Sequence, residues 1–259
     1  MLNIMYHFVG RKKALKGISI KTFQTQLDIL CKKYNKTDLT ITFDHGTADH
    51  IEHVAPELEI RGLKGTFFIL TMAPEELQVP LVDKQRHLES LYRLDLAKML
   101  CLELGISYKP AEAKNYLSMY KFYSIEERYL RYLRDEKISP TDYQAFIDDF
   151  FVKTFGDEEK FTLKEYLNWE QIIDLHRRGH IIGSHSHYHV GDKNDFAKSI
   201  NIIEEKINEE VTCVSYPNGV KKLSDDDLIK LHIKTAYISS ENGSSPFREE
   251  RVDCAQLML

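Results

Sequence analysis

Apolar residues recur along the first third of the chain with the spacing of alternating strands and helices. Runs rich in β-branched and aromatic residues predict strands, and apolar residues three or four positions apart predict helices between them. Strands are expected at 2–9, 39–43 and 65–70, one helix after an N-cap at Ser19, and another helix over 51–61. A strand, a helix and a strand at this spacing form a βαβ unit, which implies a parallel sheet.

The pattern changes over about residues 75–166. Leucines and aromatic residues keep helical spacing here, with breaks at Pro110 and Pro140, but no segment alternates as a strand does. We therefore expect a helical insertion in an α/β domain. Its many tyrosines and charged residues are expected to serve packing and solvation rather than binding.

Strand and helix patterns resume after the insertion. Helices are expected at 169–178, 196–210 and 225–231, strands at 179–183, 212–216 and 235–239, and an irregular tail after them. The chain is thus predicted to be a single α/β domain over 1–259 that carries the insertion.

Composition narrows the class of protein. Hydrophobic residues make up 42% of the 259 residues and charged residues 29%, which is a globular balance. The formal net charge of -5 gives no electrostatic footprint for nucleic acid, and no apolar run is long enough to span a membrane. The N-terminus lacks the pattern of a secretory signal and the cysteines form no CxxC pair, so we expect a cytoplasmic protein with reduced thiols.

Four of the eleven histidines fall at 180, 185, 187 and 189, directly after a predicted strand. Ligand sites of α/β folds lie at the ends of strands. Because His185 and His189 are four residues apart, a helical turn or a tight loop could direct both imidazoles at one ion, and neutral imidazole suits zinc and neighbouring transition metals. Taken alone, this spacing favours a metal site no more than a polar loop.

A carboxylate and an imidazole, Asp44 and His45, follow the strand predicted at 39–43. Together they offer a base and a third metal ligand at a strand end. In isolation, an Asp in a turn before Gly46 is the simpler interpretation. A third polar segment, at 215–219, is by itself only a turn.

The order of these three segments resembles that of the polysaccharide deacetylases, metal-dependent carbohydrate esterases with a NodB-like domain. The first motif is Thr-Phe-Asp-His-Gly at 42–46, followed by Pro-Glu-Leu at 56–58 and Gly-Thr-Phe-Phe at 65–68. The second is Trp-Glu-Gln at 169–171 and Gly-His-Ile-Ile-Gly-Ser-His-Ser at 179–186 with His189, and the third is Tyr-Pro-Asn-Gly at 216–219. The resemblance covers about residues 1–75 and 165–253, and it implies a deformed (β/α) barrel with its site at the carboxyl ends of the strands.

The resemblance also implies roles for single residues. Asp44 matches the family's catalytic base, His185 and His189 match two metal ligands, and the backbone of Asn218 matches the amide that holds the substrate carbonyl oxygen. One divalent metal ion is implied, with zinc expected first and cobalt, nickel, manganese or iron as alternatives.

This chain departs from the family pattern at three places. His45 replaces a metal-binding Asp, so either the ligand set becomes three histidines or His45 does not ligate and the site is weakened. Ser215 replaces an Arg that touches the base, and Arg251 could approach from the tail instead. The late motif that supplies the general acid is missing, and the replacements by residue type are His7, His87 and His187.

The implied activity is hydrolysis of an acyl group, most simply N-acetyl, from an amino sugar, with Asp44 as the base toward water activated by the metal. For a cytoplasmic enzyme, we expect a nucleotide-linked or lipid-linked sugar precursor of a surface polysaccharide as the substrate. Two alternatives stay open: a sugar-binding relative without catalysis, and a hydrolase of another small amide on the same scaffold. The oligomeric state is not predicted.

Overall fold

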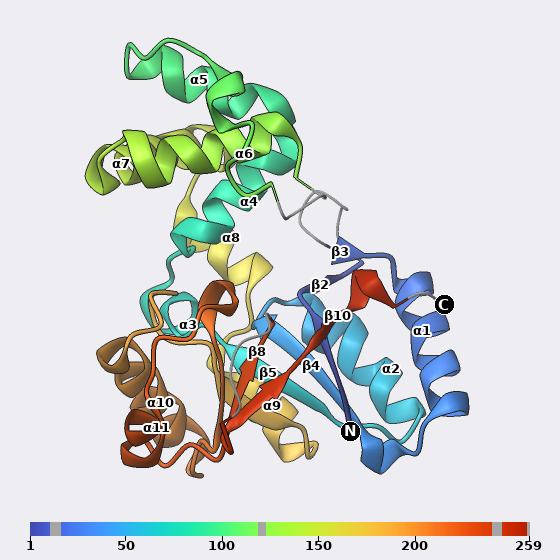
Figure 1. Cartoon of the computed structure of the whole chain (residues 1–259). Coiled ribbons are helices and arrows are strands. Elements are labelled where there is room, and N and C mark those ends of the chain that lie inside the picture. Colours follow the sequence, from blue (N-terminus) through green and yellow to red (C-terminus); the bar gives the residue numbers. More distant parts are fainter. Residues whose placement is uncertain (11–16, 119–122, 240–244, 258–259) are drawn as a thin grey trace. The chain divides into compact units, whose positions relative to one another are not determined.

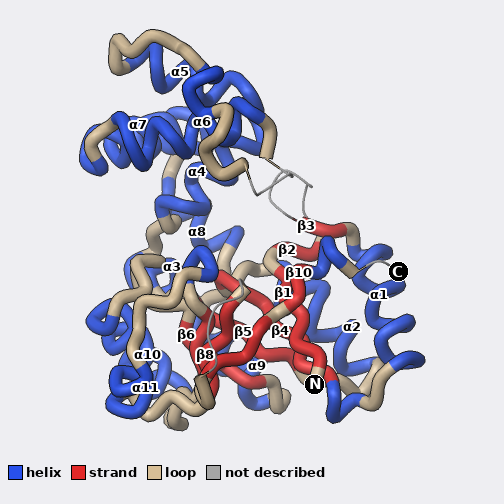
Figure 2. Tube along the Cα trace, in the orientation of Figure 1, coloured by secondary structure: helices blue, strands red, loops and turns tan. Residues whose placement is uncertain are grey.

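The chain folds into two compact units, one built around a sheet and one made of helices. The structure, a computed structural model, describes residues 1–10, 17–118, 123–239 and 245–257. The sheet-bearing unit comprises Met1–Pro80 and Glu159–Leu259, and the helical unit comprises Leu81–Glu158. Figure 2 shows the strands gathered in the first of these units.

The main sheet contains eight parallel strands in the order β10-β1-β4-β5-β6-β7-β8-β9 (Figure 1). Every neighbouring pair in this order runs parallel, which confirms the predicted α/β architecture. The strands are β1 (Leu2–Tyr6), β4 (Leu39–His45), β5 (Gly65–Ile69), β6 (Ile181–Ser184), β7 (Cys213–Ser215), β8 (Thr235–Ile238), β9 (Arg248–Glu250) and β10 (Val252–Asp253). A separate parallel pair joins β2 (Phe8–Val9) and β3 (Gly17–Ile18).

The tail joins the two edges of this sheet. β9 pairs with β8 and β10 pairs with β1, and only Arg251 separates β9 from β10. The segment 248–253 therefore turns an open sheet into a nearly closed (β/α) barrel, as the sequence resemblance implied. The expectation of an irregular tail is wrong because strands of three and two residues are too short to show a period, and β9 contains no apolar residue.

Helices cover the outer face of the barrel and bury its main hydrophobic core. Tyr6, Phe43 and Phe67, from three adjacent strands, stack with ring centroids 5.4 and 5.0 Å apart and are fully buried. As predicted, Ser19 caps the first helix by accepting a hydrogen bond from the Thr22 amide. The helices of this unit are α1 (Ile20–Lys33), α2 (Ala55–Ile60), α3 (Met72–Glu76), α9 (Trp169–Arg177), α10 (Lys193–Ile207) and α11 (Asp225–Lys230), and α8 (Glu158–Glu165) begins at the unit boundary.

A smaller cluster fills the inside of the barrel. The Phe68 ring of β5 lies 5.4 Å from the Tyr237 ring of β8, although these strands are not neighbours in the sheet. Because successive residues of a strand point to opposite faces, Phe67 faces the helices while Phe68 faces inward, and its register partner Asp44 faces inward with it. The barrel interior thus carries both apolar and charged side chains.

The helical unit, Leu81–Glu158, lies within the segment of about 75–166 that was predicted to be a helical insertion. It contains α4 (Leu81–Tyr92), α5 (Leu96–Glu103), α6 (Ile125–Tyr132) and α7 (Pro140–Phe155), and no strand is found among its described residues. A buried pair, Arg131 and Glu89, links α6 to α4 through two hydrogen bonds of 2.8 and 3.2 Å. In the described parts of both units, no helix is long and apolar enough to cross a membrane.

The tight barrel interior predicts a cost for Gly183→Ala. A methyl group at Gly183 would lie 2.6 Å from the Phe68 ring and 2.9 Å from the Cys213 carbonyl oxygen, so atoms on two strands must shift. We expect a loss of about 1–3 kcal/mol in the free energy of unfolding, measured by urea denaturation. In a Phe68→Leu background the same change should cost less, and an equal loss in both backgrounds would contradict this packing.

Candidate active site

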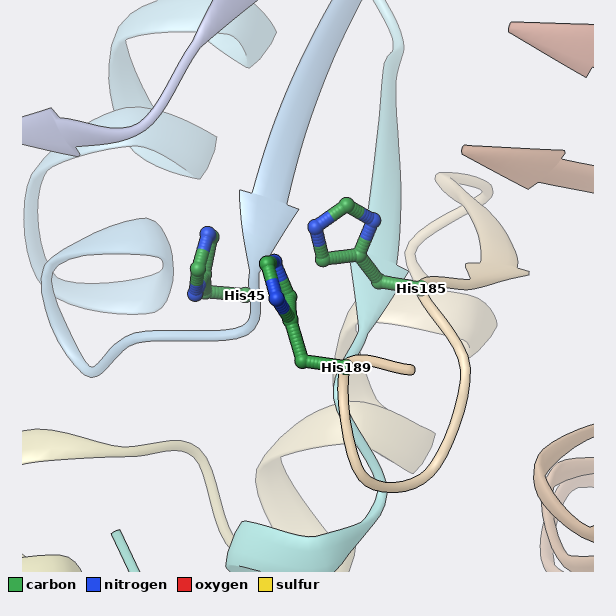
Figure 3. A group of neighbouring side chains, drawn as sticks. All are labelled: His45, His185 and His189. Carbon is green, nitrogen blue, oxygen red and sulfur yellow. The ribbon is translucent and has the colours of Figure 1, made fainter. Parts of the chain in front are cut away.

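Three histidines converge at the carboxyl ends of β4 and β6 (Figure 3). His45 is the last residue of β4, His185 follows β6 directly, and His189 lies in the loop that continues from it. One ring nitrogen from each lies within 4.8 Å of the other two, and the ring centroids are 5.0–5.3 Å apart. The two distant segments that the sequence singled out thus share one site.

The backbone is strained where it presents these rings. His45, Ser186 and His189 have φ angles of 79°, 70° and 62°, in the left-handed region that residues other than glycine rarely adopt. Such conformations cost on the order of 1–3 kcal/mol each and persist only where the surroundings hold them. The bonds that hold the first two run from the Leu70 amide to the His45 carbonyl and from the Thr71 amide to the Ser186 carbonyl.

The protonation of His185 is fixed by its neighbours. Its Nδ1 lies 2.9 Å from the Ser215 carbonyl oxygen, which can only accept, so Nδ1 carries the proton and Nε2 keeps its lone pair. Burial lowers the pKa of His185 to about 4, against the opposing effect of Asp44, so the ring is neutral at pH 7. A neutral imidazole whose second nitrogen is held by a carbonyl is the usual form of a metal-ligating histidine.

Asp44 lies beside this cluster and forms a buried, bidentate pair with Arg251. The two oxygens of Asp44 accept from the Arg251 guanidinium at 2.7 and 2.9 Å. Arg251 also donates to the hydroxyls of Thr42 and Ser215, at 3.1 and 2.7 Å. Burial by itself would raise the pKa of Asp44, but the guanidinium holds this pKa well below its usual range, so the carboxylate stays ionised. Arg251 therefore occupies the place next to Asp44 that Ser215 leaves open.

Asn218 lies in the turn after β7, with a left-handed φ of 57°. Two contacts hold the segment of Asn218 against the histidine loop. The Ser215 carbonyl accepts a hydrogen bond from His185. Gly191 packs so closely against Pro217 that a methyl group on the glycine would lie 2.9 Å from the proline ring. In the described part of the chain, no hydrogen bond from the Asn218 amide is found. This amide is therefore able to donate to a ligand.

The three candidate acids lie in different surroundings. The ring of His7 is 5.5 Å from the ring of His45, next to the site. His187 is fully buried, and its two ring nitrogens lie 2.8 Å from the Thr71 hydroxyl and 2.7 Å from the Glu76 carboxylate. His87 belongs to the helical unit, where it packs against two phenylalanines, Phe151 and Phe155.

One residue of the site was missed by the sequence analysis. The Asp195 carboxylate accepts backbone hydrogen bonds from the loop that carries His189. An Asp three residues after the helix cap Asp192 is an ordinary helix-start pattern, so sequence gives no signal that its side chain turns back to a loop.

The donor set fits a divalent metal ion of the zinc type. A tetrahedral ion with bonds of about 2.0–2.1 Å keeps its ligand nitrogens roughly 3.4 Å apart, and ring nitrogens that lie within 4.8 Å of one another leave room for such an ion. Three neutral nitrogen donors match zinc and neighbouring transition metals, whereas magnesium and calcium prefer oxygen.

Comparison with known proteins adds the fold to this geometry. No protein-family model and no curated protein matches the chain. Among solved structures, the deacetylase PplD of Streptococcus pyogenes, in complex with acetate, matches with a TM-score of 0.55 at 11% identity, over 98% of this chain and 91% of that one. IcaB from Ammonifex degensii matches with a TM-score of 0.54 at 15% identity, over 97% and 90%. A de-N-acetylase from Aggregatibacter actinomycetemcomitans matches with a TM-score of 0.55 at 12% identity, over 98% and 95%.

The chain has the polysaccharide deacetylase fold. This confirms the resemblance that the three motifs suggested, at the level of the NodB-like barrel. Within that fold, the segments carrying Asp44, His185 and Asn218 lie at the carboxyl ends of β4, β6 and β7, the end of the strands at which α/β barrels place their active sites.

The Asp44–Arg251 pair predicts a large effect of Arg251→Met on stability. The substitution leaves a carboxylate buried without a counter-ion, which typically costs about 3–5 kcal/mol, measured as the free energy of unfolding in urea. Adding Asp44→Asn should restore part of the loss, because the uncompensated charge is then removed.

Arg248→Met provides a matched control in the same tail segment. The Arg248 side chain is 5% exposed, but its partner Asp225 is 43% exposed and stays hydrated when the arginine is removed, so we expect a clearly smaller loss than in Arg251→Met. Equal losses for the two arginine variants would show that the buried pair has no special weight.

Proposed function

We propose that this protein is a metal-dependent hydrolase that removes an acyl group, most simply N-acetyl, from an amino sugar. The observation that carries the proposal is the convergence of His45, His185 and His189 beside the ionised carboxylate of Asp44 at the strand ends. The fold shared with deacetylases supports the same reaction class.

His45, His185 and His189 would hold the metal. When bound, a divalent metal in such a site acts as a Lewis acid that polarises the acyl carbonyl and lowers the pKa of water. The replacement of a carboxylate ligand by His45 is compatible with this chemistry, since three-histidine sites with an open position are found in zinc hydrolases.

Asp44 would act as the general base. As the water oxygen attacks the acyl carbon, its proton passes to the Asp44 carboxylate. The Arg251 pair keeps Asp44 ionised and hence able to accept that proton, and each carboxylate oxygen has lone pairs beyond those that Arg251 uses.

Asn218 and His7 would complete the reaction. The Asn218 amide would donate to the oxyanion of the tetrahedral intermediate, a contribution of about 3–4 kcal/mol for one such donor. His7, the candidate acid whose ring lies next to His45, would give a proton to the sugar nitrogen as the carbon–nitrogen bond breaks. The products are a carboxylate and a free amino sugar.

We propose an amino sugar of a surface polysaccharide, or its nucleotide-linked or lipid-linked precursor, as the substrate. The three histidine side chains carry no negative charge and Arg251 balances the charge of Asp44, so these residues do not themselves repel an anionic precursor.

Asp44→Asn separates catalysis from metal binding. We expect the rate of acetate release from N-acetylated amino sugars to fall by at least about 10²–10⁴-fold, because the proton acceptor is lost, while the zinc content stays that of the wild type. Unchanged acetate release would refute the role of Asp44 as base. Stoichiometric metal in the wild type with no acyl release from any amino sugar would instead favour a sugar-binding protein.

Histidine substitutions test the metal site directly. After loading with zinc and removal of excess ion, we expect about one zinc per wild-type chain by elemental analysis, and a clear loss in His45→Ala and in His185→Ala. His176→Ala is the control, because His176 lies on α9 and pairs with Glu209 outside the site. Wild-type protein that retains no divalent metal after loading would contradict the proposed function.

A further inference from the structure

Asp195 is a buried acidic residue in the first turn of α10, and its carboxylate faces the histidine loop. Its Oδ1 accepts from the amides of His187 and Tyr188, at 3.1 and 2.7 Å. Its Oδ2 accepts from the amides of Val190 and Gly191, at 2.9 and 2.8 Å. A carboxylate offers about four lone-pair sites, so four backbone donors use this side chain fully.

These four amides flank His189, two before it and two after it. The His189 backbone, which lies between the two pairs of amides, has a φ of 62°. Gly191, the last of the four donors, has a φ of 78°. A free loop would leave such conformations for less strained ones. The carboxylate therefore holds the loop in the one shape that turns the His189 ring toward His45 and His185.

Helix capping does not account for this arrangement. The N-cap of α10 is Asp192, whose side chain accepts from the Asp195 amide at 3.0 Å. Both carboxylate oxygens of Asp195 accept from amides of the loop. The helix start and the loop are therefore held by two different carboxylates of the same turn.

We propose that Asp195 is a positioning residue that preorganises the His189 arm of the metal site, an inference that rests on the metal-binding function proposed above. With the loop already shaped in the metal-free protein, less conformational entropy is lost when the ion binds. Asp195 acts through the loop backbone and touches neither the ion nor the substrate.

The test compares Asp195→Asn with Asp192→Asn. Both changes remove one negative charge from the same helical turn, and Asn caps helices as well as Asp does. In Asp195→Asn, however, an NH₂ group must face two backbone donors. The zinc dissociation constant, measured by competition with a chelator, should rise on the order of 10–100-fold in Asp195→Asn and stay close to the wild-type value in Asp192→Asn.

A second readout distinguishes positioning from general stability. We expect the rise in melting temperature that zinc causes in the wild type to shrink in Asp195→Asn, because a weaker-binding ligand stabilises less. A purely structural role would lower the melting temperature equally with and without zinc and leave the zinc dissociation constant unchanged, which would overturn the proposal.

The outcomes separate this inference from the proposed function. If the wild type binds no zinc, the metal-dependent function fails and the inference fails with it. If the wild type and Asp195→Asn bind zinc equally tightly, the inference alone is overturned.

If Asp195→Asn does not fold, hydrogen exchange of the metal-free wild type takes its place. Slow exchange of the amides of residues 187, 188, 190 and 191 supports the proposal, and exchange at unprotected rates in an otherwise folded chain overturns it.

Discussion

The buried pair of Asp44 and Arg251 is the interaction on which the rest of this site depends. An ionised carboxylate inside a barrel is stable only beside a positive partner that also satisfies its hydrogen bonds. Arg251 is the one residue between β9 and β10, the strands that join opposite edges of the sheet. Closure of the barrel and ionisation of Asp44 therefore depend on the same segment of the chain. The same pair that keeps Asp44 ionised also makes its carboxylate a weaker proton acceptor, because a lower pKa means a lower affinity for the proton.

A second constraint is the conformational strain that the site accumulates. His45, His189 and Asn218 all adopt left-handed backbone, and each carries a group assigned to the proposed chemistry. The strain is balanced by buried polar contacts that reach the site from other elements. Ser215 supplies a contact of another kind, because its carbonyl accepts from His185 while its hydroxyl accepts from Arg251. His185, a proposed metal ligand, and Arg251, the partner of the proposed base Asp44, are thus linked through one short strand, β7.

Sequence patterns predict the fold where an element is long enough to show a period or contains a recognisable motif. The strand ending at His45 and the helix capped by Ser19 carry local signals, and the helical insertion shows a clear period. β9 and β10 carry no such signal, because they are defined by long-range pairing to β8 and β1. The sequence analysis offered Arg251 as a residue that could approach Asp44 from the tail. The pairing of β9 with β8 and of β10 with β1 explains how the tail brings Arg251 to Asp44. The loop contacts of Asp195 could not be predicted, because a capping pattern looks the same whichever way the carboxylate turns.

The position of the closing strands also bears on the order of folding. A ribosome makes β1 first and β10 last among the strands of the barrel, so the pairing of Ile4 with Val252 is a contact of very high sequence separation. Until residue 251 has been synthesised, Asp44 has no counter-ion, and its charge favours a hydrated, open sheet over a sealed one. Elements such as β1, β4 and α1 are able to dock early, whereas the proposed active site is complete only after β9 and β10 have paired. Assembly of the proposed active site is therefore a late event in the folding of this chain.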